Sequence, residues 1–252
     1  MKNIKKLTAL ILVLILAMSC LASCDFFKED LQMDKYVANV RMVFATDDAN
    51  MKAAIDIMSA SSVLTVDGDN ISVETNSVIN DASLQDSYTY VDGVVYHCTK
   101  ITLDDKFAAS FEKADMPAEN RDALISKIGT GANITLSDFE VQEMTTSGDS
   151  NEYACSEITD EARESLQAVF ASRFAGLDAV VQLNEAEYIL ETYKGRTSSS
   201  ILSCHFTIIM NGKSFDVTVH TYYDYDYKAD VNISAPQDAD KYNTVSYEDI
   251  IG

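Results

Sequence analysis

The sequence lacks several features that would place it in a familiar class of protein. After Cys24 it has no uncharged apolar run of about 20 residues, the length that a helix needs to cross a bilayer. It contains 2 proline and 9 glycine residues among 252, and no Pro- or Gly-rich linker divides it. We therefore expect one continuous domain after the N-terminal segment.

Positive charge is scarce as well. The chain carries 19 Lys and Arg against 40 Asp and Glu, a formal net charge of −21. Such a surface repels phosphate backbones and anionic lipid headgroups, so nucleic acid is not an expected partner. Calcium or a basic protein partner is permitted by this charge but not implied by it.

Recognisable catalytic motifs are also missing. The patterns Gly-x-Ser-x-Gly, His-Glu-x-x-His and the P-loop do not occur. Ser110-Phe-Glu-Lys113 fits the Ser-x-x-Lys of penicillin-recognising enzymes, but the companion Ser-Asp-Asn and Lys-Thr-Gly elements are absent. Gly129-Thr-Gly131 follows an expected helix, which is not the place of a dinucleotide fingerprint. We expect a protein that is not an enzyme and has no cofactor.

Histidine and cysteine form two neighbouring pairs, His97-Cys98 and Cys204-His205. Neighbours on a strand point to opposite faces, so the two residues of a pair cannot reach one ion. A diagonal pair of His205 with His220 on a polar face would lack a third ligand. We expect no metal site from these residues.

Two acidic segments are candidates for calcium sites. Asp67-Gly-Asp-Asn70 begins like a calcium loop, but Ile71 and Val78 stand where an EF-hand needs oxygen ligands. Turn chemistry explains this segment. Asp224 and Asp226 alternate with tyrosines, which suits either a weak cation site or a solvated turn.

The N-terminal segment reads as a secretory signal. Lys2, Lys5 and Lys6 precede an uncharged apolar run, Leu7–Ala22, which ends in the small residues of Leu21-Ala22-Ser23-Cys24. A cationic head, an apolar run and small residues before a cleavage point are the parts of such a signal.

The residues Leu-Ala-Ser-Cys resemble the bacterial lipobox, which implies diacylglyceryl transfer to the Cys24 thiol, cleavage before it and acylation with fatty acids such as palmitate. Cys20 fits less well, because Ala17 stands where the lipobox has a larger aliphatic residue. An uncleaved anchor is the alternative. We therefore predict a signal peptide (1–23), a short tether (24–34), one domain (35–252) and an extracytoplasmic location on the bacterial cell membrane. Loss of the three signal lysines lowers the net charge to −24.

Three cysteines remain in the domain: Cys98, Cys155 and Cys204. An odd number cannot be fully paired. We expect all three to be buried as small hydrophobic residues, although the count allows one disulfide.

The segments before residue 100 read mainly as strands. Residues 36–46 alternate between apolar and polar, which predicts a half-buried strand. Residues 51–62 fit helix or strand, and we favour strand. Turns at Asp67–Asn70 and Asp92-Gly93 predict two hairpins, the first with Val66 opposite Ile71.

In the rest of the chain, some segments have the apolar spacing of helices and others the alternation of strands. We expect helices within 103–128 and from Thr159 or Asp160 to about Ala175, with strands around a turn at 145–151 between them. A hairpin about Asn211-Gly212 should place Ile208 opposite Phe215. A last strand is expected at Val231–Ile233, before Pro236.

The order of these elements resembles the LolA-like lipoproteins of bacterial envelopes. These comprise the LppX/LprG-type carriers and Gram-positive lipoproteins of that fold. The resemblance covers about residues 34–250, with Tyr90–Tyr96 and Val231–Pro236 as its clearest pieces. It implies an α+β fold, a strongly curved antiparallel half-barrel with helices packed on its concave face.

Two functions follow as alternatives. One is a carrier or binding module for a lipid or hydrophobic ligand, held in a slot between the sheet and the helices. The other is an interaction protein with a filled core, whose acidic surface meets a basic envelope partner or cations. Sequence alone does not separate a filled core from a slot.

Overall fold

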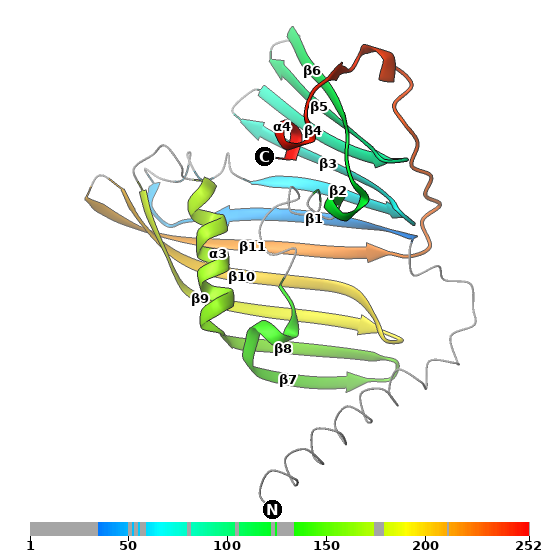
Figure 1. Cartoon of the computed structure of the whole chain (residues 1–252). Coiled ribbons are helices and arrows are strands. Elements are labelled where there is room, and N and C mark those ends of the chain that lie inside the picture. Colours follow the sequence, from blue (N-terminus) through cyan, green and yellow to red (C-terminus); the bar gives the residue numbers. More distant parts are fainter. Residues whose placement is uncertain are drawn as a thin grey trace, which may run out of the picture. The chain divides into compact units, whose positions relative to one another are not determined.

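The chain divides into two units, Met1–Met33 and Asp34–Gly252. The computed structural model describes residues 35–49, 52, 55, 59–79, 82–103, 106–121, 124, 134–173, 179–210 and 212–251, all in the second unit. Every strand in this part of the chain belongs to one sheet (Figure 1). The strands are β1 (Lys35–Ala45), β2 (Ala60–Asp67), β3 (Asn70–Ile79), β4 (Ala82–Val91), β5 (Val94–Leu103), β6 (Lys106–Asp115), β7 (Phe139–Ser147), β8 (Ser150–Ile158), β9 (Ala179–Tyr193), β10 (Arg196–Met210), β11 (Lys213–Asp226) and β12 (Asn243–Thr244).

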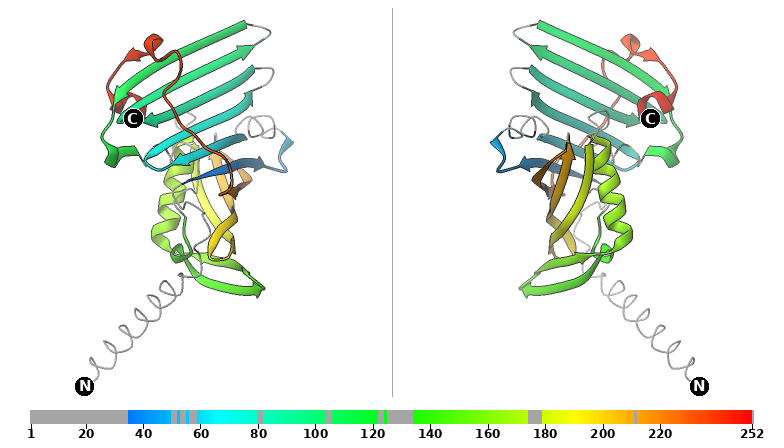
Figure 2. Two further views of the ribbon diagram at one scale, coloured as in Figure 1. Left: turned by 90° about the vertical axis from the view of Figure 1, so that its right-hand side faces the viewer. Right: turned by 90° about the vertical axis from the view of Figure 1, so that its left-hand side faces the viewer.

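The sheet is two meanders joined along one seam. Its order in space is β12-β6-β5-β4-β3-β2-β1-β11-β10-β9-β8-β7. The seam is the antiparallel pair of β1 with β11, and among the described strands only β12 and β6 pair in parallel. The sheet twists strongly, so that β3–β6 cross the direction of β9–β11 (Figure 2).

The expected α+β half-barrel with helices on its concave face is wrong. The described part of the chain is mostly β, with 66% strand, in one open sheet of twelve strands. The α-helices with complete bounds in the described part are α3 (Asp160–Arg173) and the short α4 (Tyr247–Ile251). Two 3₁₀ turns, η3 (Leu136–Asp138) and η4 (Ala239–Lys241), accompany them.

The largest single error is the helix expected within 103–128. Its first part is strand β6, in which Phe107 pairs with Thr102 and Phe111 with Cys98. Apolar residues four positions apart share a face in a strand as well as in a helix, so this spacing does not distinguish the two. Beyond β6, residues 118–121 and Leu124 have 3₁₀ conformation, and the rest of the expected second helix, residues 122–123 and 125–128, lies outside the described residues.

Two smaller expectations also fail. In the segment favoured as strand, Lys52 and Ile55 are helical, and β2 begins only at Ala60. Residues 231–233 lie outside any strand, although Val231 and Ile233 are buried. Val231 and Ile233 are buried on either side of exposed Asn232, so the alternation reflects burial without pairing to any described strand.

The hairpins are confirmed with their registers. Val66 pairs with Ile71 and Val91 with Val94. Ile208 pairs with Phe215, as the two-residue loop after Met210 requires. The strands around residues 145–151 are β7 and β8, which pair from Ser147–Ser150 outward.

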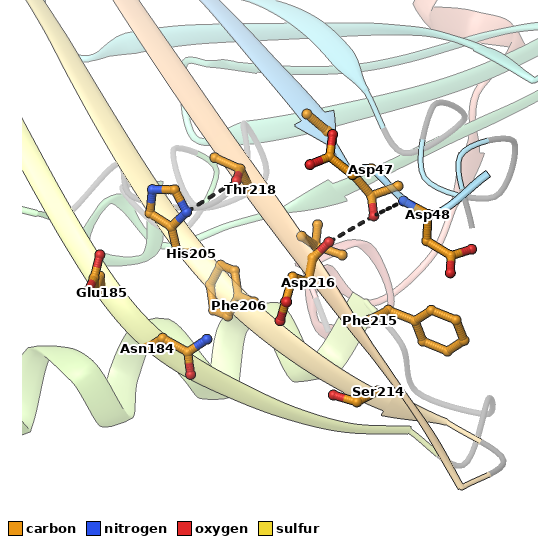
Figure 3. Close-up of a pocket in the computed structure, with 13 residues that line it drawn as sticks. Asp47, Asp48, Asn184, Glu185, His205, Phe206, Ser214, Phe215, Asp216 and Thr218 are labelled. Carbon is orange, nitrogen blue, oxygen red and sulfur yellow. Dashed lines mark hydrogen bonds between the residues drawn. The ribbon is translucent and has the colours of Figure 1, made fainter. Parts of the chain in front are cut away.

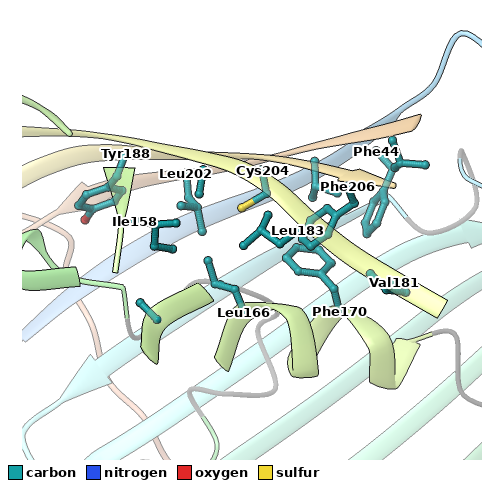
Figure 4. Close-up of a cluster of buried hydrophobic side chains, with 14 of the residues drawn as sticks. Phe44, Ile158, Leu166, Phe170, Val181, Leu183, Tyr188, Leu202, Cys204 and Phe206 are labelled. Carbon is teal, nitrogen blue, oxygen red and sulfur yellow. The ribbon is translucent and has the colours of Figure 1, made fainter. Parts of the chain in front are cut away.

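Both hydrophobic clusters lie on one face of the sheet, which we call the inner face; the opposite face is the outer face. The first cluster lies between β9–β11 and α3 (Figure 4), and α3 contributes Ala162, Leu166 and Phe170 to it. The rings of Phe170 and Phe206 lie 4.1 Å apart, so helix and sheet are in direct contact. Helix α3 is confirmed, although Val169 of its expected apolar face is 43% exposed.

The second cluster covers the inner face of β1–β5. Its members include Leu64, Val73 and Val95, and Ile250 of α4 packs into it. Tyr242 stacks edge-on against Tyr96 and Phe111 on the outer face. The C-terminal segment therefore passes around the edge of β6, where β12 pairs with it.

Candidate functional site

The predicted lipidation residue, Cys24, lies outside the described residues, as do the signal peptide and the tether. Within residues 35–251 as described, no helix is long and apolar enough to cross a membrane. The lipid anchor therefore remains a prediction from the sequence.

The outer face of β9–β11 carries a depression of about 700 Å³ (Figure 3). Carboxylates surround it: Glu185 from β9, Asp216 from β11, and Asp47 and Asp48 from the segment after β1. Outward positions alternate with the buried ones along each strand, which explains why polar side chains collect there. His205 of β10 is the imidazole among them.

Hydrogen bonds hold the floor of this depression in place. Asn184 Nδ2 donates to Thr207 Oγ1 at 2.9 Å, and Thr207 Oγ1 donates to Asp216 Oδ1 at 3.0 Å. Thr46 Oγ1 donates to the Asp216 carbonyl oxygen at 2.8 Å, which ties the segment after β1 to β11. The result is a preformed acidic surface that suits a cationic group.

The histidines predicted to lie diagonally on the polar face do so but do not form a site. His205 Nδ1 lies 3.2 Å from Thr218 Oγ1, and His220 Nδ1 lies 2.9 Å from Ser203 Oγ. Each imidazole has a hydroxyl partner on the neighbouring strand. No group of three or more His, Cys, Asp or Glu in the described part could hold a metal ion.

Asp224 and Asp226 share the outer face at the end of β11. Asp226 Oδ1 accepts a hydrogen bond from the Lys228 backbone N–H at 2.8 Å, which is turn chemistry. Asp224 is exposed opposite Asn39 of β1. The arrangement fits the solvated turn better than a cation site.

The Ser-x-x-Lys match is not a catalytic pair. Ser110 and Lys113 lie three positions apart on β6, so they point to opposite faces. The Lys113 ammonium donates to the Ala239 carbonyl oxygen at 2.8 Å. Its role in the structure is to hold the C-terminal segment. Gly129-Thr-Gly131 lies outside the described residues.

A cluster on the inner face was missed by sequence reasoning. His97 of β5 lies between two carboxylates, with Nε2 2.8 Å from Asp86 Oδ1 and Nδ1 3.3 Å from Glu112 Oε2. Its ring stacks on Tyr88 at 4.4 Å. Thr99 Oγ1 donates to Asp86 Oδ1 at 2.8 Å. The Asp92-Gly93 turn fixes Tyr88 opposite His97, so the hairpin register was the signal that could have found this contact.

The two carboxylates determine the charge of this cluster. Burial alone would lower the pKa of His97, but hydrogen bonds and charge attraction from Asp86 and Glu112 outweigh it and raise the pKa. Burial opposes ionisation of Asp86 too, yet its contacts with His97 and Thr99 lower the pKa of that carboxyl. With a carboxylate oxygen at each ring nitrogen, a protonated His97 donates from both and keeps no free nitrogen for a proton from Thr99 or for a metal ion. These contacts favour a structural role for the cluster.

The three domain cysteines are buried and unpaired, as expected. Burial raises the pKa of Cys204 to about 12 and also raises the pKa of Cys98 and Cys155. Their thiols stay protonated at neutral pH, so they act as small core residues.

No model of a known protein family matches this chain, and a search of curated protein sequences finds none similar to it. The resemblance to LolA-like lipoproteins therefore stays a prediction.

Proposed function

We propose that this protein is a lipid-anchored, extracytoplasmic interaction module of a bacterial envelope, without enzymatic activity. Its acidic outer face binds a basic envelope partner or cations. The anchor is the lipid on Cys24, attached as the lipobox resemblance implies, and a diacyl group with a further acyl chain meets the two-signal requirement for stable anchoring.

One contrast supports this choice. Beneath α3 the inner face is filled by side chains in direct contact, such as Phe170 on Phe206. The depression on the outer face instead opens to solvent and is lined by carboxylates. A filled interior with a preformed acidic exterior favours a surface interaction over the storage of a ligand.

The lipid carrier is the second candidate, and one observation favours it. Ile101 and Leu103 lie on the inner face of β5, beyond the second cluster, and they are 47% and 46% exposed. An acyl chain laid on this strip would gain about 0.8 kcal/mol per buried CH₂.

The acidic surface is tested with a nine-residue polylysine peptide and isothermal titration calorimetry. The double variant Asp47→Asn/Asp48→Asn removes two charges at the depression, and Glu161→Gln/Glu164→Gln removes two from the exposed side of α3 as a matched control. We expect affinity about fivefold or more weaker for the first variant, less than about twofold weaker for the control, and a fall with added salt. Equal losses in both variants, or no binding at all, would overturn the proposal.

A further inference from the structure

The two edges of the sheet differ in whether another segment of the chain covers them. At one edge, β12 pairs with β6, and Tyr242 and α4 hold the C-terminal segment around it. At the other edge, β7 pairs with β8 on one side only. Apart from buried Phe139, every residue of β7 is exposed, so no described segment covers this edge.

The hairpin register shows which backbone groups are free. Gly148, with φ +62°, opens a two-residue turn between Ser147 and Ser150. Residues that flank such a turn are hydrogen-bonded to each other, and bonded and non-bonded pairs then alternate along the hairpin. Gln142, Met144 and Thr146 are therefore the positions whose N–H and C=O groups point away from β8.

The negative charge of the β7–β8 hairpin favours a basic partner over an acidic one. Residues 139–158 contain Glu140, Glu143, Asp149, Glu152 and Glu157 but no Lys or Arg. A second copy of this hairpin would bring another five carboxylates and no cation to the edge, which is unfavourable because like charges repel. A basic strand would meet complementary charge.

We propose that β7 is a docking edge that takes an extended basic segment of an envelope protein as a thirteenth strand. On the outer face, lysines of that segment would lie beside Glu143, and on the inner face apolar residues would lie beside Met144, which is 60% exposed. The added strand satisfies the free backbone groups, and the alternating side chains supply selectivity. This inference rests on the proposed function and specifies how the basic partner is held.

The test uses the mature, lipidated protein in detergent and a seven-residue peptide of alternating lysine and valine. Met144→Pro removes one outward N–H without breaking a β7–β8 hydrogen bond, because edge strands tolerate proline there. Met144→Ala keeps the N–H and is the matched control. We expect Met144→Pro to weaken binding about tenfold or more and Met144→Ala by less than about threefold.

Two further measurements do not depend on how the proline variant folds. Binding of the peptide should slow amide hydrogen exchange at Gln142, Met144 and Thr146. Methylation of alternate peptide nitrogens should abolish binding, although it leaves the lysines charged.

The outcomes separate this proposal from the proposed function. Unchanged exchange at β7, or equal binding of the methylated peptide, overturns the docking edge. If Asp47→Asn/Asp48→Asn still weakens polylysine binding in that case, the acidic outer face stands. If neither peptide binds, both proposals are overturned.

Discussion

At the scale of single residues, the cluster around His97 makes stability depend on pH. The raised pKa of His97 means that its contribution is complete below 6.5, the ordinary value, and is lost as pH rises through the folded-state pKa. The lowered pKa of Asp86 means that its contribution is complete above 3.8 and is lost as pH falls through its folded-state value. The cluster therefore stabilises the fold most between these limits.

The variant His97→Asn should remove this dependence. We expect the free energy of unfolding of the wild type, measured by urea denaturation, to fall as the pH is raised from 6 to 9, and the fall to be smaller in His97→Asn. His205→Asn on the outer face, where the imidazole is hydrogen-bonded to the Thr218 hydroxyl, is the control; it should change the slope less than His97→Asn does. A slope unchanged in His97→Asn would show that the carboxylates do not hold the imidazolium.

The buried hydroxyl of a second residue, Tyr223, lowers the stability of the fold. Its hydroxyl is buried and has no hydrogen-bond partner among the described residues. Burying an unsatisfied polar group costs about 1–3 kcal/mol. We expect Tyr223→Phe to raise the free energy of unfolding by about 1 kcal/mol. Tyr188→Phe, which removes a hydroxyl bonded to Ser200, should lower it, and a loss of stability in both variants would refute the assignment.

At the scale of elements, the sequence predicted hairpins better than helices. Short turns such as Asp92-Gly93 fix both the turn type and the pairing, so Tyr90 opposite Val95 could be predicted from adjacent residues. The segment with Phe107 and Phe111 has no such marker, and its spacing suits both structures. Only its pairing with β5, a contact between segments, decides that it is a strand.

The attachment of α3 rests on a few large side chains. Phe170 is 1% exposed and contacts both Phe44 and Phe206. Truncating a buried Phe to Ala costs about 3–5 kcal/mol. We expect Phe170→Ala to lower the free energy of unfolding by about this amount and Val169→Ala, at an exposed neighbour, by less than about 1 kcal/mol. Equal effects would mean that α3 packs by another face.

At the scale of the whole molecule, the composition led to the expectation of one domain, but it carries no information on the shape of the sheet. The pairing of β1 with β11 joins residues such as Val40 and Tyr223, which are far apart in the chain. No local pattern encodes that seam. The acidic depression could not be predicted for the same reason, because Asp48 and Glu185 meet only through that pairing of distant strands.

The predicted anchor also concerns the whole molecule. With the net charge of −24 expected after cleavage before Cys24, attraction to anionic lipids cannot hold the protein on a membrane. We expect Cys24→Ser to leave the precursor unprocessed or to release the protein, measured by membrane fractionation and intact mass. A Cys24→Ser protein that is cleaved correctly and stays membrane-bound would contradict the lipobox assignment.

The central claim is that this protein acts through its surface and not by carrying a ligand in its interior. The most direct measurement is the native mass of residues 25–252, the domain with its tether but without the lipidated cysteine, before and after exposure to lipids extracted from bacterial membranes. If the core is filled, both spectra should show the mass of the protein without any bound lipid. A reproducible increase by the mass of one lipid would contradict the account and establish the carrier in its place.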